Sequence, residues 1–134
     1  MFLHVGLDDT DSNKGMCTTY VMARIIDEVV NKGFGRLIGH PRLIRLNPTC
    51  PYKTRGNAAL AVLFETRHLE DIKEIAIKFT EELAEMEEDA TDPGLVFYKG
   101  EEVPNEIAQF SDRAVREMVG LEEAFFLIKK YSIE

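Results

Sequence analysis

The segment GLDDTDSNKGMCTTY, residues Gly6–Tyr20, joins a predicted strand to a predicted helix. Phe2–Leu7 overlaps its start and is mostly apolar, a pattern typical of a short buried strand. The residues after the segment place apolar side chains at helical spacing: Met22, Ile25, Ile26, Val29 and Val30. A strand, a polar loop and an amphipathic helix therefore form the first unit of the fold, and the other elements are assigned around it.

Three carboxylates lie within four residues of this loop, at Asp8, Asp9 and Asp11. Like charges this close repel one another, so we expect a cation to stabilise them. Mg²⁺ prefers oxygen ligands and usually shares them with substrate phosphates. A polar turn that caps a helix would explain one or two acids, but not three. The cluster therefore predicts a magnesium site.

The other end of the same loop predicts an anion site. Thr18 and Thr19 supply hydroxyls where the helix is expected to begin, and Gly15 supplies backbone freedom just before it. The free N–H groups and the positive dipole of a helix N-terminus attract phosphate. A cation site and a phosphate site in one loop indicate nucleotide chemistry.

Composition indicates one soluble domain covering residues 1–134, with 45% hydrophobic residues and a net charge of −8. No apolar run approaches the roughly 20 residues that span a membrane, and the N-terminus lacks a signal-peptide pattern. We therefore expect a cytoplasmic protein without membrane contact. The two cysteines are too few for a disulfide framework or a zinc site.

A local basic segment stands out against the acidic total. Between residues 29 and 64 there are six Lys and Arg side chains and no acid. Five residues of this region form a candidate surface for phosphate or RNA: Arg42, Arg45, Tyr52, Lys53 and Arg55. Arg and Lys pair with phosphate, and a tyrosine can stack on a base. An edge strand protected by charge is the alternative interpretation of the arginines.

The order of predicted elements is β-α-β-β-α-β over residues 1–100, followed by a helical extension over 103–131. This order predicts an α+β, ferredoxin-like sandwich with an antiparallel sheet and both main helices on one face. The second strand, 36–46, contains Pro41 and is expected to be bent, broken or at an edge. The last two helices are expected to turn these residues inward: Ile107, Phe110 or Ser111, Ala114, Met118, Leu121, Ala124, Phe125 and Ile128.

Three motifs occur in order across residues 6–60: GLDDTDSNKGMCTTY, PRLIRLNP and PYKTRGNAAL. Together they closely resemble the N-terminal region of the archaeal isoleucine-tRNA 2-agmatinylcytidine synthetases. Residues 91–96, TDPGLV, are also similar to an Asn-Pro-Gly turn of that family, with Asp92 in place of the asparagine. The combination of motifs is specific, whereas the acidic run alone would not be.

The resemblance implies an ATP-dependent ligase that modifies tRNA. Members of the family couple agmatine to the wobble cytidine of an isoleucine tRNA with a CAU anticodon, after phosphoryl activation of the base. By resemblance, Asp8, Asp9 and Asp11 would bind Mg²⁺, and Thr18 matches the threonine that the family phosphorylates. Thr18, Asp8 and Asp9 would then be the catalytic residues.

The resemblance also implies roles for the remaining candidates and for regions beyond this chain. Gly15, Thr18 and Thr19 would bind the ATP phosphates, and Lys53 and Arg55 would hold ATP or tRNA. The family continues well past 134 residues, so we expect an N-terminal, kinase-like domain that works with further C-terminal domains and is inactive alone.

Two other functions fit parts of the sequence. Asp9 and Asp11 have the DxD spacing of a metal-dependent phosphotransferase or phosphohydrolase with an aspartyl nucleophile, which would require a parallel, doubly wound sheet. A non-catalytic RNA-binding module is the second alternative, with structural acids and a binding surface over residues 42–57.

Overall fold

The computed structural model describes residues 1–8, 18–46, 58–83 and 93–134. Four strands and four helices follow one another in these ranges: β1 (Phe2–Asp8), α1 (Thr18–Asn31), β2 (Gly35–Arg45), β3 (Ala58–Thr66), α2 (Leu69–Leu83), β4 (Gly94–Lys99), α3 (Asn105–Arg116) and α4 (Leu121–Lys130). Their order is the predicted one. Of the described helices, none is long and apolar enough to cross a membrane.

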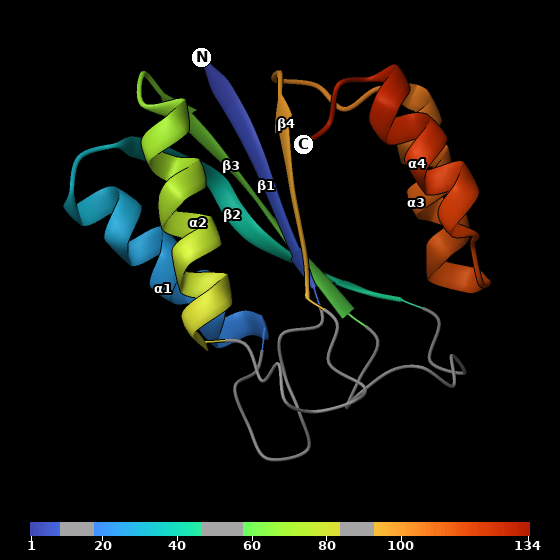
Figure 1. Cartoon of the computed structure of the whole chain (residues 1–134), viewed down its shortest axis with the longest axis horizontal. Coiled ribbons are helices and arrows are strands. Elements are labelled where there is room, and N and C mark those ends of the chain that lie inside the picture. The colour runs from blue at the N-terminus through green and yellow to red at the C-terminus, as the bar shows by residue number, and fades with distance from the viewer. Residues whose placement is uncertain (9–17, 47–57, 84–92) are drawn as a thin grey trace.

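The strands form one sheet in the order β2-β3-β1-β4. Each neighbouring pair is antiparallel, and β1 pairs with both β3 and β4. Helices α1 and α2 cover one face of the sheet, while α3 and α4 lie on the other side of β4, with α3 toward the opposite face (Figure 1). This arrangement confirms the predicted α+β, ferredoxin-like fold with its antiparallel sheet.

The core lies between the sheet and the pair α1 and α2. Strand β1 alternates in burial, so that Leu3, Val5 and Leu7 enter the core and the residues between them face the other way. Leu60, Val62 and Phe64 do the same on β3, as their spacing predicts. The face opposite the core, here called the second face, therefore holds the odd-numbered residues of β3 and the even-numbered residues of β1.

Strand β2 is an edge strand with an irregularity in its middle. Its pairing with β3 shifts between Ile38 and Arg42. Gly39 has φ +67°, a conformation that glycine adopts readily, and Pro41 cannot donate a ladder hydrogen bond. The prediction that this strand is bent, broken or at an edge is confirmed, since β2 is an edge strand with an irregular register.

The C-terminal helices bury less than their apolar periodicity predicts. Helix α3 has no buried residue, and α4 buries Leu127. The spacing predicts that Met118, Leu121 and Phe125 face inward, but they are 58%, 73% and 62% exposed, so that prediction is wrong. Spacing shows that one side of a helix is apolar, but it does not show that this chain covers that side.

The C-terminal residues are anchored on β4 and α2. Phe97 and Glu134 exchange two backbone hydrogen bonds, of 2.8 and 3.0 Å. Lys73 Nζ lies 3.0 Å from both carboxylate oxygens of Glu134, and this hydrogen bond raises the pKa of the lysine. The end of α4 is thereby held against the sheet although the helix itself packs loosely.

Helix α1 offers a direct test of the core. Val29 is fully buried, whereas Val30, which the spacing placed in the core, is 47% exposed, and that assignment is wrong. Val29→Ala should lower the free energy of unfolding by about 2 kcal/mol. Val30→Ala, with the same change in helix propensity, should alter it by no more than about 0.5 kcal/mol. Urea denaturation measures both, and equal losses would contradict the packing.

Candidate functional site

The residues that flank the predicted motifs lie together at one end of the sheet. Ile44, Ala59, Asp8 and Gly94 form a continuous row across the strands β2, β3, β1 and β4. Strands β1 and β2 end at this row, while β3 and β4 begin there. Helix α1 also starts at this end, with Thr18 (Figure 1). The acidic loop and the basic loop are therefore joined to the same edge of the sheet.

Asp8 is held in place by the neighbouring strand. Its side chain is half-buried, and Gly94 donates its backbone N–H to Asp8 Oδ1 over 3.1 Å. A Cβ atom at position 94 would lie only 2.6 Å from that oxygen. Glycine is thus required for the carboxylate to approach β4 this closely. The sequence indicated the turn at 91–96 through the family resemblance, but not its contact with Asp8.

Thr18 and Thr19 begin α1. Thr18 is half-buried and Thr19 is exposed. The first turn of α1 contains no acidic residue, so its own side chains do not neutralise the positive end of the helix dipole. The phosphate site at this helix start stays a prediction.

Six of the predicted site residues lie outside the described residues: Asp9, Asp11, Gly15, Tyr52, Lys53 and Arg55. Within the described ranges, no group of three or more His, Cys, Asp or Glu side chains is arranged to hold a metal ion. Of the three carboxylates predicted to bind Mg²⁺, Asp8 alone is described. The magnesium site and the roles of Lys53 and Arg55 remain predictions.

The two described arginines of the basic segment lie on opposite faces of the sheet. Arg42 pairs with Ala61 and Arg45 with Ala58, in an unbroken register. Because successive strand residues alternate between faces, Arg42 lies on the second face and Arg45 on the core side. Both are exposed. The two arginines therefore project from opposite sides of the edge strand β2.

A cavity of about 330 Å³ opens beside Asp8, between the second face and α3. Small residues from the three strands β1, β3 and β4 line one side of it: Gly6, Ala59, Ala61 and Gly94. Phe110, Ser111 and Ala114 of α3 line the other. Sequence reasoning missed this feature, whose signal is the occurrence of glycine and alanine at alternate positions of neighbouring strands.

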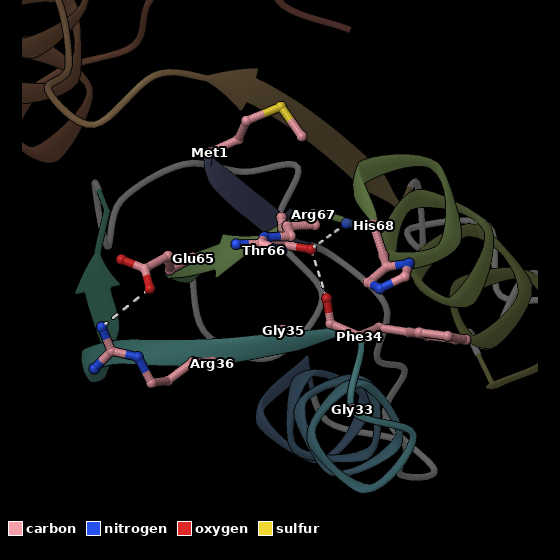
Figure 2. Close-up of a pocket in the computed structure, with 9 residues that line it drawn as sticks. All are labelled: Met1, Gly33, Phe34, Gly35, Arg36, Glu65, Thr66, Arg67 and His68. Atoms are coloured by element: carbon pink, nitrogen blue, oxygen red, sulfur yellow. Dashed lines mark hydrogen bonds and ion pairs between the residues drawn. The ribbon is translucent and has the colours of Figure 1, made fainter.

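A second hollow, of about 610 Å³, lies at the opposite end of β1, around Met1 (Figure 2). The Thr66 hydroxyl that lines it is already paired within the chain, since Thr66 Oγ1 donates to the Phe34 carbonyl over 2.5 Å and accepts from the His68 N–H over 2.7 Å. Asp8 ends β1 while Met1 precedes it. This hollow is therefore remote from the predicted chemistry.

The contact between Asp8 and Gly94 predicts a specific energetic coupling. Gly94→Ala should lower the free energy of unfolding by about 1–3 kcal/mol, because the new methyl group displaces a charged hydrogen-bond acceptor. In an Asp8→Ala background the same change should cost about 1 kcal/mol less. A double-mutant cycle in urea measures the difference. An equal cost in both backgrounds would contradict the proposed clash.

Comparisons with known proteins agree with the sequence motifs. Residues 4–68 match the family model described as the TiaS TCKD domain. The chain is 46% identical, over 136 residues, to TiaS of Pyrococcus horikoshii, a 2-agmatinylcytidine synthetase for an isoleucine tRNA, and 44% identical to TiaS of Archaeoglobus fulgidus. The alignments cover 100% and 99% of this chain, but 31% of each relative.

Solved structures show the same relationship. The crystal structure of a complex of TiaS with an isoleucine tRNA and ATP superposes with a TM-score of 0.87 and 42% identity over the whole chain, which covers 32% of that protein. A tRNA fluorescent labeling enzyme superposes with a TM-score of 0.92 at the same identity. The expected resemblance to the N-terminal region of these synthetases is confirmed. The chain belongs to the TiaS family and spans about a third of the length of its curated relatives.

Proposed function

We propose that this chain is the ATP- and Mg²⁺-binding part of an enzyme that conjugates agmatine to the wobble cytidine of isoleucine tRNA. The observation that supports it most directly is the row through Asp8. This row joins the acidic loop, the basic loop and the start of α1 to one end of the sheet. Phosphoryl transfer depends mainly on positioning and charge stabilisation, which such a convergence can supply.

Each of these site residues has a specific role in the proposed reaction. The Gly94 amide orients the Asp8 carboxylate, an oxygen ligand of the kind that Mg²⁺ prefers. Asp9 and Asp11 would complete the set, and the ion would neutralise the phosphate charge. Thr18 presents a hydroxyl at a helix start that lacks its own acid, so it is the proposed phosphoryl acceptor. Gly15, Thr19, Lys53 and Arg55 are the proposed phosphate contacts.

The solved relatives support the choice of ligands. Their described complexes include TiaS with an isoleucine tRNA and ATP, and TiaS with the same kind of tRNA, AMPCPP and agmatine. We therefore propose the same substrates here, in a cytoplasmic enzyme. Because the chain spans about a third of those proteins, further domains are proposed to supply the remaining contacts, and the 134 residues alone should not modify tRNA.

The two alternatives are less well supported. The aspartyl phosphotransferase would need a parallel sheet, whereas the four described strands pair antiparallel. A pure RNA-binding module gives no role to the convergence of the acidic loop and the start of α1 on the row through Asp8. The proposed function instead uses Arg42, Arg45 and Tyr52 as separate tRNA contacts.

Calorimetric titration with ATP, with and without Mg²⁺, tests the proposal. Asp8→Asn keeps an acceptor for the Gly94 N–H but removes the charge, so it should weaken Mg²⁺-dependent ATP binding by at least about tenfold. Asp27→Asn removes an acid from the exposed side of α1 and should leave binding unchanged. Binding that ignores Mg²⁺, or that survives Asp8→Asn, would refute the assignment of Asp8.

A further inference from the structure

Helices α3 and α4 are joined to each other by charged side chains. Arg113 of α3 forms an ion pair with Glu123 of α4, and Glu106 of α3 forms one with Lys130 of α4 over 2.5 Å. Each helix contributes one acid and one base to these contacts. The two helices lie on the other side of β4 from α1 and α2 (Figure 1). Helix α4 therefore turns a charged side toward α3.

The opposite side of α4 is apolar and exposed. With about 3.6 residues per turn, Leu121 and Phe125 lie on the side of the helix opposite Glu123 and Lys130. Leu121 and Phe125 are here called the apolar face of α4. Six of the twelve large apolar residues that are exposed in the described ranges lie in this part of the chain: Val103, Val115, Met118, Leu121, Phe125 and Phe126. A concentration of this kind is typical of an interaction surface.

The apolar face of α4 is held in a fixed position. Leu127, on another side of the helix, is buried. Beyond the helix, Glu134 exchanges backbone hydrogen bonds with Phe97 of β4, and its carboxylate is bound by Lys73 of α2. Because these contacts already order α4, a partner that binds its apolar face pays little for ordering it. The face is therefore a preorganised docking surface.

The charge around this face disfavours a second copy of the chain as the partner. Residues 101–134 contain eight acids and four Lys or Arg side chains, a net charge of −4. Two copies would bring two acidic surfaces together, whereas a partner with basic residues around an apolar centre would be attracted. The chain spans about a third of its curated relatives, and the rest of such an enzyme would be basic where it holds a tRNA.

We propose that the apolar face of α4 is the docking surface for the remaining two-thirds of the synthetase, which would contact it through an apolar patch with a basic rim. The identity of this partner rests on the proposed function, which requires further domains. Because Glu134 ties the end of α4 to β4, docking there would fix those domains relative to the strand whose Gly94 orients Asp8.

A chimera tests the inference in a complete enzyme. In it, this chain replaces the matching third of the Pyrococcus horikoshii relative, and Phe125→Cys supplies a thiol on the apolar face. Maleimide labelling, read by peptide mass spectrometry, should be at least about tenfold slower at this position in the chimera than in the 134-residue chain, because docking covers the thiol. Ile77→Cys, on the exposed part of α2, should react equally fast in both.

Two serine substitutions measure the contribution of the face to binding. Leu121→Ser and Phe125→Ser should leave the urea midpoint of the chain unchanged, because both side chains are exposed. Each should weaken calorimetric binding of the separately produced remainder of the relative by at least about tenfold, as expected for large apolar residues at the centre of an interface. Ile77→Ser is the matched control and should leave that binding intact.

The outcomes separate the docking surface from the alternatives. Equal labelling of Phe125→Cys in the chain and in the chimera would overturn the inference, whether or not the separate part of the relative folds. Sedimentation of the chain as a dimer that Phe125→Ser dissociates would assign the face to a second copy and would also overturn it. Neither measurement uses ATP or Mg²⁺, so the titration of Asp8→Asn still tests the proposed function independently.

Discussion

The pairing of β1 with a strand on each side is the constraint on which the remaining structure depends. Because β3 and β4 both run antiparallel to β1, the residues at its end are fixed from two directions. The backbone of Asp8 is therefore held by both neighbouring strands, and the hydrogen bond from the Gly94 N–H also ties its side chain to β4. A carboxylate placed by a sheet is more precisely positioned than one placed by a loop, as charge stabilisation in phosphoryl transfer requires.

Much of the fold could be predicted because it follows from local rules. Leu3, Val5 and Leu7 alternate along β1, and α1 and α2 carry apolar residues at helical spacing, so element type and order were clear. The wrong predictions concern which apolar residues are covered by another element of the fold. Val30, Met118 and Phe125 are apolar residues at plausible core positions, yet they are exposed because no element of the described chain packs over them. Periodicity carries no information about a partner surface.

Less of the candidate site could be predicted, because part of it depends on contacts between residues that are distant in the sequence. Asp8 and Thr18 were identifiable because crowded charge and helix starts have consequences within a few residues of sequence. Gly94 acts on Asp8 from 86 positions away, and the cavity-lining residues Gly6 and Ala61 meet through strand register. Contacts of this kind depend on tertiary pairing, so a single sequence shows only unexplained small residues.

One face of the sheet carries large side chains that stabilise the fold, and the other carries small side chains that leave a cavity. On the core side, large aliphatic residues bury area and stabilise the fold. On the second face, glycine in the central strand β1 weakens the strand by about 0.5–1 kcal/mol relative to alanine, because it loses more backbone entropy on folding. A glycine at that position also buries almost nothing. The sheet tolerates this loss because a continuous core of fourteen buried residues lies between its other face and the helices α1 and α2.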